Sequence, residues 1–180
     1  MIAAIASRRS IRAYADEPVS EEALAQILEA ARLAPSGSNT QPWHYIVIRS
    51  AERRAAVAKV SHDQKWMNTA PLFIACVGDI GSRIPDYDGP PLDERSALPE
   101  LKQLIRDMGI GIEHLVLEAE NQGLGTCWVA WFTQDEIRRV LGVPDSAYVV
   151  AVVTIGVPLK RPETPHRRRA MDDIVHYERW

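Results

Sequence analysis

One long amphipathic helix constrains this chain more than any other feature. Between residues 101 and 122, apolar side chains recur on one helical face, at Leu104, Ile105, Met108, Ile112, Leu115, Val116 and Ala119. Gly123 and Gly125 follow this stretch and predict the end of the helix. Because such a helix has to bury its apolar face, we expect it to be the central helix of the core.

Strand-like and helical segments alternate irregularly around this helix. Apolar and β-branched composition predicts strands at residues 45–48, 72–77, 126–130 and 147–157. Capping residues and helical periodicity predict further helices at residues 20–33, at residues 52–60 and from the Thr133/Glu136 capping box to Leu141. These elements lack the strict repeat of a doubly wound parallel sheet. The fold class that we expect is therefore α+β, with a central sheet flanked by helices.

Composition limits the partners that the chain can have. For 180 residues we expect one domain, residues 1–180, and the net charge of -3 argues against nucleic acid and anionic lipid as partners. The longest apolar run, residues 148–153, is too short to span a membrane, and residues 1–6 lack the features of a secretory signal. Cys76 and Cys127 lie in apolar surroundings, which favours buried reduced thiols over a disulfide, a metal site or a catalytic cysteine. These features predict a cytoplasmic protein.

A polar loop connects the first long helix to the first strand. It offers backbone N–H groups and short polar side chains, a composition suited to wrapping a polar ligand, at Pro35, Ser36, Gly37, Ser38 and Asn39. The alternative is a polar connection with no role beyond joining a helix to a strand.

Two basic clusters lie near opposite ends of the chain. The first consists of Arg8, Arg9, Ser10 and Arg12, and the second of Arg167, Arg168 and Arg169. Arginine and hydroxyl groups at this density can give a phosphate several charge-assisted hydrogen bonds. Each cluster alone could also be a solvated basic turn. The presence of both in a chain of net negative charge favours a dianionic ligand.

Other motifs do not support a different chemistry. The glycine pairs in the long helix and after it do not complete a dinucleotide-binding motif, and His114 with Glu118 lacks a third metal ligand. Residues 79–99 and 158–180 show no regular pattern, and we expect both to resist packing. The first is a candidate lid or mobile loop, and the second a basic and aromatic tail that docks on a partner subunit.

Five motifs, in order along nearly the whole chain, resemble those of the flavin-dependent nitroreductase family. They are RRSIRAY from Arg8, APSGSNTQPWH from Ala34, GIGIEHLVLEA from Gly109, GLGTCW from Gly123 and HYE from His176. The resemblance implies an intertwined homodimer of α+β subunits, with one FMN in each of two clefts at the interface. It also implies that NADH or NADPH reduces the FMN, after which a small planar acceptor such as a nitroaromatic or a quinone takes the electrons.

The resemblance also implies a role for each site residue. Arg8, Arg9 and Ser10 would hold the phosphate and ribityl chain, helped from the tail by Arg167, or by Arg168 and Arg169. Arg12 and Gln64 would lie at the pyrimidine edge of the ring. The loop of Pro35, Ser36, Gly37, Ser38 and Asn39 would reach the FMN of the partner chain, and backbone N–H groups around Val129, Ala130 and Trp131 would face flavin N5.

No catalytic side chain is implied, because FMN carries the chemistry. Related families on the same scaffold reduce enones, remove halogens or fragment flavin, and these activities are alternatives for this chain. A flavin-binding protein without turnover is a further alternative.

Overall fold

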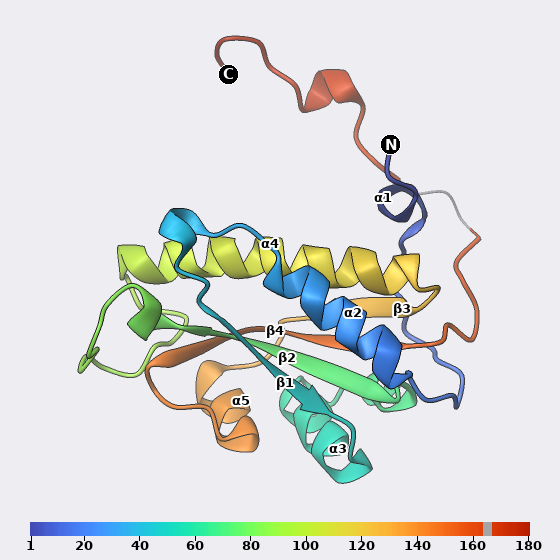
Figure 1. The fold of residues 1–180 in the computed structure, drawn as a ribbon, viewed down its shortest axis with the longest axis horizontal. Coiled ribbons are helices and arrows are strands. Elements are labelled where there is room, and N and C mark those ends of the chain that lie inside the picture. Colours follow the sequence, from blue (N-terminus) through green and yellow to red (C-terminus); the bar gives the residue numbers. More distant parts are fainter. Residues whose placement is uncertain (164–166) are drawn as a thin grey trace.

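A four-stranded antiparallel sheet forms the centre of the molecule (Figure 1). The computed structural model describes residues 1–163 and 167–180. The sheet has the order β1-β2-β4-β3, with β1 (Trp43–Ile48), β2 (Leu72–Asp79), β3 (Gly125–Val129) and β4 (Ala147–Gly156). Because β1 and β3 lie at opposite edges, the central strands β2 and β4 carry most of the pairing. The expected α+β fold class is confirmed.

Helices cover both faces of this sheet (Figure 1). The α-helices are α1 (Ala3–Ser7), α2 (Glu21–Arg32), α3 (Ala51–Val60), α4 (Pro99–Asn121) and α5 (Gln134–Leu141). Short 3₁₀ turns occur at η1 (Gly37–Asn39), η2 (Lys65–Thr69), η3 (Ile80–Ser82) and η4 (Met171–Asp173). Helices α2 and α4 lie on one face, and α3 and α5 lie on the other.

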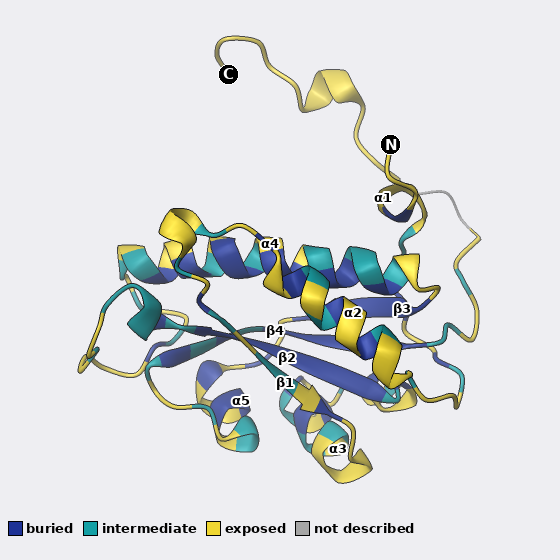
Figure 2. Ribbon diagram, viewed as in Figure 1, coloured by how far each residue is buried: buried dark blue, intermediate teal, exposed yellow. Residues whose placement is uncertain are grey.

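Strand β2 shows how the sheet divides the core. Leu72, Ile74 and Cys76 pack with residues of α2 and α4, whereas the alternate residues Phe73 and Ala75 pack with residues of α3 and α5. Both faces of a central strand are therefore buried, which explains its continuous apolar run. Figure 2 shows β2 and β4 almost entirely buried.

Helix α4 is the central helix that its apolar periodicity predicts. Its side chains at Leu104, Met108, Ile112 and Leu115 are fully buried against the sheet and α2. The helix begins two residues before the expected start, because Pro99 occupies its first turn, where a missing N–H costs nothing.

The expectation that residues 79–99 resist packing is wrong for part of this segment. Ile80 and Leu92 are fully buried. The N–H of Leu92 donates to the carbonyl oxygen of Asp145 at 3.0 Å, and the buried Arg138 of α5 donates to the carbonyl oxygen of Leu92. Hydrogen bonds from α5 and from the turn before β4 therefore fix the middle of the segment, for which the sequence shows no periodic signal.

The C-terminal tail leaves the body of the molecule near α1 (Figure 1). Every residue from 167 to 180 is exposed, including the apolar Met171, Ile174 and Trp180 (Figure 2). An extended tail that carries exposed apolar side chains has no core of its own to bury them in.

Candidate functional site

The first arginine cluster lies along the outer edge of β3. Ser10 forms a parallel bridge with Thr126, and the N–H of Ile11 donates to the carbonyl oxygen of Thr126 at 2.8 Å. The segment after α1 therefore runs beside β3 as a short additional strand. This pairing places the cluster at one edge of the sheet.

Tyr14 anchors this segment to the central strand β4. Its buried hydroxyl donates to the carbonyl oxygen of Ile11 at 2.8 Å and lies 2.7 Å from the hydroxyl oxygen of Thr154 in β4. Burial raises the pKa of the Tyr14 phenol, so the group stays protonated and can donate at physiological pH.

We expect Tyr14→Phe to lower the free energy of unfolding by about 1–3 kcal/mol, because it leaves buried acceptors without their donor. Urea denaturation of the FMN-free protein measures this change. Tyr45→Phe is the matched control, since the buried Tyr45 hydroxyl has no hydrogen-bond partner among the described residues and its deletion should cost little. Equal stability of the two variants would contradict the anchoring role of Tyr14.

The cations of this cluster stay close to the β3 edge. The Nε atom of Arg8 lies 3.9 Å from Oε1 of Glu113 on α4, and Nη1 of Arg9 donates to the carbonyl oxygen of Pro162 at 3.3 Å. The guanidinium of Arg12 lies 5.7 Å from the ring centre of Trp66, within the range of a cation–π contact. Three cationic side chains thus project from the short segment that pairs with β3, and each contacts a different neighbour.

A group of aromatic and amide side chains borders the cluster beyond the end of β3. The indole N–H of Trp66 donates to Oε1 of Gln64 at 3.1 Å, and Nε2 of Gln64 donates to the carbonyl oxygen of Ser61 at 3.0 Å. The ring of His62 stacks on Trp131, with centroids 3.9 Å apart. No sequence motif identifies His62, because its position depends on a left-handed backbone, φ 57°, for which the sequence gives no signal.

The outer edge of β3 carries backbone donors beyond Thr126. Since the Thr126 carbonyl faces the N-terminal segment, strand alternation turns the N–H groups of Trp128 and Ala130 toward the same edge. The N–H of Val129 faces β4 instead. Of the three positions expected to face flavin N5, Ala130 is the one that alternation turns outward, and Trp131 follows it with 64% of its surface exposed.

The polar loop lies over α4, away from the arginine cluster. The N–H of Gly37 donates to Oδ1 of Asp107 at 3.1 Å, which fixes η1 above the first half of the helix. Ser38 and Asn39 have left-handed backbones, with φ of 54° and 53°. Within the loop, the N–H of Gln41 donates to the Ser36 hydroxyl oxygen at 2.9 Å.

A single subunit does not bring the loop and the cluster together. The loop contacts α4 at Asp107, whereas the hydroxyl of Ser7, just before Arg8, donates to Glu120 on the same helix at 2.7 Å. The interval from residue 107 to residue 120 corresponds to about 20 Å along the helix axis, and the contact of Arg8 at Glu113 still lies about 9 Å from Asp107 along that axis. Figure 1 shows η1 and α1 near opposite ends of α4.

Comparison with known proteins explains this arrangement of sheet, helix and basic cluster. The sequence model of the Nitroreductase family matches residues 5–157. The chain belongs to the nitroreductase family. It is 31% identical over 182 residues to an Archaeoglobus fulgidus protein provisionally named NADH dehydrogenase/NAD(P)H nitroreductase, a match that covers 98% of this chain and 96% of that protein.

Two further comparisons fit this membership. The chain is 29% identical to the FMN reductase (NAD(P)H) of Bacillus subtilis, over 92% of this chain and 70% of that protein. The solved structure of an FMN-dependent nitroreductase from Clostridium difficile superimposes on the whole chain with a TM-score of 0.82 at 26% identity, and the match covers 100% of both chains. The nitroreductase fold expected from the motifs is confirmed.

The second arginine cluster of this nitroreductase-family chain lies in the exposed tail. Nη1 of Arg168 donates to the carbonyl oxygen of Arg167 at 2.9 Å, and Nη2 of Arg169 donates to that of Asp173 at 2.7 Å. These bonds stay within the tail. Contact of the tail arginines with a bound phosphate remains a prediction.

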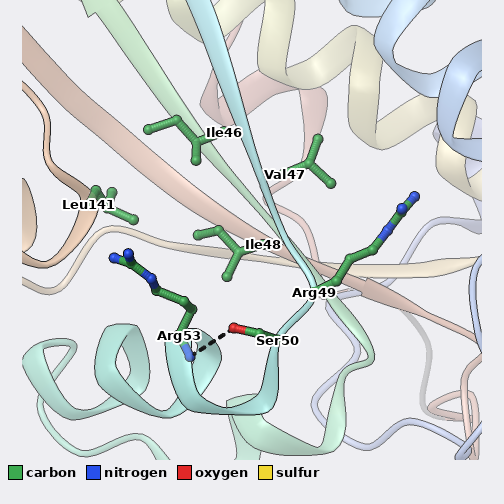
Figure 3. Close-up of a pocket in the computed structure, with 7 residues that line it drawn as sticks. All are labelled: Ile46, Val47, Ile48, Arg49, Ser50, Arg53 and Leu141. Atoms are coloured by element: carbon green, nitrogen blue, oxygen red, sulfur yellow. Dashed lines mark hydrogen bonds between the residues drawn. The ribbon is translucent and has the colours of Figure 1, made fainter.

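The cavity in Figure 3 lies elsewhere on the molecule. It encloses about 400 Å³ between β1, the start of α3 and Leu141 of α5. Its polar residue Ser50 accepts a hydrogen bond from the N–H of Arg53 at 3.2 Å and so serves as the cap of α3. Because β1 is the sheet edge opposite β3, this cavity is not part of the candidate site.

Neither cysteine is suited to nucleophilic chemistry. Both are free thiols and buried, as expected from their apolar surroundings. Burial raises the pKa of the Cys76 thiol and of the Cys127 thiol, which suppresses the reactive thiolate.

None of the helices in residues 1–163 and 167–180 combines the length and the hydropathy needed to cross a bilayer.

Proposed function

We propose that this protein is an FMN-dependent NAD(P)H oxidoreductase in which residues 1–180 form one cofactor-binding domain. The observation that carries the proposal is the position of Arg8, Ser10 and Arg12 along the β3 edge, beside the outward N–H of Ala130. A flavin mononucleotide needs cations at one end and hydrogen-bond donors along its ring, and this edge offers both. The names of the relatives agree with this assignment.

Different residues at the β3 edge hold different parts of FMN. Arg8, Arg9 and Ser10 hold the phosphate and ribityl chain, and Arg12 places a positive charge at the pyrimidine edge of the ring beside Gln64. The N–H of Ala130 faces flavin N5. FMN supplies the hydride and electron chemistry, and the protein supplies position and charge.

The complete site requires a homodimer. Exposed apolar side chains, including Ile2 (67% exposed) and Leu33 (63% exposed), border a groove of about 550 Å³ between α1, α2 and α4. A second subunit that covers this surface would also bring its own loop, Ser36 to Asn39, toward the arginine cluster of the first. The partner's tail, with Arg167, Arg168 and Arg169, would help to hold the phosphate.

The electron acceptors are nitroaromatics, quinones or similar planar molecules in the cytoplasm. Exposed Trp131 and its stacked partner His62 offer flat aromatic surface next to the proposed ring site. NAD(P)H and the acceptor use this cleft in turn, as expected for ping-pong kinetics.

Steady-state assays with NADH and with NADPH, across nitroaromatics, quinones, enones and halophenols, test this proposal. We expect rapid nicotinamide oxidation with the first two acceptor classes. Turnover confined to enones or halophenols would select one of the other reductive activities. A flavin-loaded protein that turns over none of these acceptors would be a flavin carrier and would refute the enzymatic proposal.

A further inference from the structure

A buried ion pair joins three segments that are distant in the sequence. Arg83, which follows η3, donates from Nη2 to Oδ2 of Asp107 on α4. The two side chains are only 9% and 10% exposed. The other carboxylate oxygen of Asp107 accepts the N–H of Gly37, at the start of η1, at 3.1 Å. Asp107 is therefore the point at which the 79–99 segment, the long helix and the polar loop meet.

This pair is poorly arranged for stability alone. Burying two charges costs free energy that their attraction recovers only when the remaining polar atoms are also satisfied. Nη1 of Arg83 donates to Gln103 at 2.7 Å, but its buried Nε has no hydrogen-bond partner among the described residues. A well-packed apolar pair could stabilise the fold equally well. The charged pair is therefore better explained by a need to hold the polar loop in one defined geometry.

The loop that Asp107 holds is under backbone strain. Ser38, Asn39 and Gln41 all have positive φ, at 54°, 53° and 47°, which is costly for residues other than glycine. Such a conformation persists only where contacts outside the loop fix it. Gly37 makes that contact, and a Cβ atom at this position would lie 3.1 Å from Nη2 of Arg83. A side chain at residue 37 would therefore require the Arg83 guanidinium to shift by a few tenths of an ångström.

We propose that Asp107 is a positioning residue for the cofactor, oriented by Arg83, and that it fixes the turn from Ser36 to Asn39 in the conformation that binds the partner subunit's FMN. This inference rests on the proposed function. It adds a buried carboxylate, remote from the β3 edge, to the determinants of FMN affinity. It also assigns a function to the 79–99 segment, because Arg83 belongs to that segment.

Two double variants isolate the hydrogen bond to Gly37. Both replace Arg83 with Met, so that no unpaired cation remains, and they differ only at residue 107. Asp107→Asn keeps an acceptor for the Gly37 N–H, whereas Asp107→Leu removes it. FMN titration of the FMN-free proteins, followed by flavin fluorescence, gives the dissociation constants, and thermal unfolding of the same proteins monitors the fold.

We expect the Leu variant to bind FMN about twofold to tenfold more weakly than the Asn variant, the range of ratios that a lost hydrogen bond of ordinary strength produces. Their unfolding midpoints without FMN should be similar. Arg138→Met is the matched control, because Arg138 is another buried arginine that fixes the 79–99 segment, at Leu92, without touching the loop. It should leave FMN affinity unchanged.

Equal FMN affinity in the two double variants would overturn the inference. Amide hydrogen exchange on the wild-type protein tests the same point without any substitution. The Gly37 N–H should already be protected before FMN is added, and rapid exchange there would also overturn the inference. Wild-type protein that binds no FMN would instead refute the proposed function, so the two failures are distinguishable.

Discussion

Replacement of both Arg8 and Arg12 by alanine is expected to weaken FMN binding about a hundredfold or more, because two charge-assisted hydrogen bonds of about 1.5–3 kcal/mol each are lost. Both side chains project from the segment that Ser10 and Ile11 pair with β3. Their loss therefore removes cations from the proposed phosphate and ring-edge positions together. Equilibrium titration of FMN-free protein with FMN measures the effect.

A second arginine pair provides the control for lost positive charge. Arg95 and Arg106 are exposed and distant in sequence from the β3 edge, so the double alanine variant changes the net charge equally. It should bind FMN as the wild type does. A folded Arg8→Ala/Arg12→Ala variant with unchanged FMN affinity would refute the assigned role of the cluster.

Truncation after Pro158 is expected to disrupt the dimer and to release FMN. The removed segment includes residues 167–180, all of them exposed, whose apolar side chains find no core within their own subunit. If the tail packs on the partner, its loss exposes apolar surface on both chains and removes the three tail arginines. Light scattering after gel filtration measures the mass, and flavin absorbance measures the bound cofactor.

Truncation after Glu163 separates the loss of the exposed tail from the loss of residues 159–163, which contact their own subunit. It keeps Arg161, whose Nη1 donates to both carboxylate oxygens of Glu120 at 2.8 Å and so ties the segment to α4 of the same chain. If the tail acts through the partner, both truncations should give the same defect. A monodisperse, flavin-bound dimer after either truncation would count against a crossing tail.

Local signals in the sequence predict most of the regular structure. Ser20 caps α2 by accepting the N–H of Ala23, and the hydroxyl oxygen of Thr133 accepts the N–H of Glu136, as expected from the capping box. The strand at residues 72–77 extends two residues further, to Asp79. This extension depends on pairing with β4, which no local signal encodes.

Irregular segments limit such prediction. Leu92 lies in a stretch rich in proline, glycine and aspartate, yet it is fully buried because Arg138 and Asp145 supply its backbone partners. These partners lie more than forty residues away in the sequence. Long-range hydrogen bonding of this kind leaves no periodic pattern to read.

Some residues of the candidate site can be predicted from the sequence, and others cannot. The family resemblance implies roles for Arg12 and Gln64, and the structure places both beside Trp66. Asp107 was missed, although a charged residue among the core-facing positions of an amphipathic helix is itself a signal. His62 has no comparable signal, because a left-handed backbone turns it toward Trp131.

The most direct test of the account is FMN stoichiometry in mixed dimers. One chain carries Arg8→Ala/Arg12→Ala, and the other carries Ser38→Ala/Asn39→Ala, which alters the polar loop. Each variant alone should form dimers without FMN. In a mixed dimer, one site combines the intact arginine cluster of one chain with the intact loop of the other.

We therefore predict one FMN per mixed dimer, measured by flavin absorbance against protein mass, beside two per wild-type dimer. If each FMN site were built within a single chain, both sites of the mixed dimer would be defective. Mixed dimers that hold no FMN would contradict the claim that the loop from Ser36 to Asn39 serves the flavin of the other subunit.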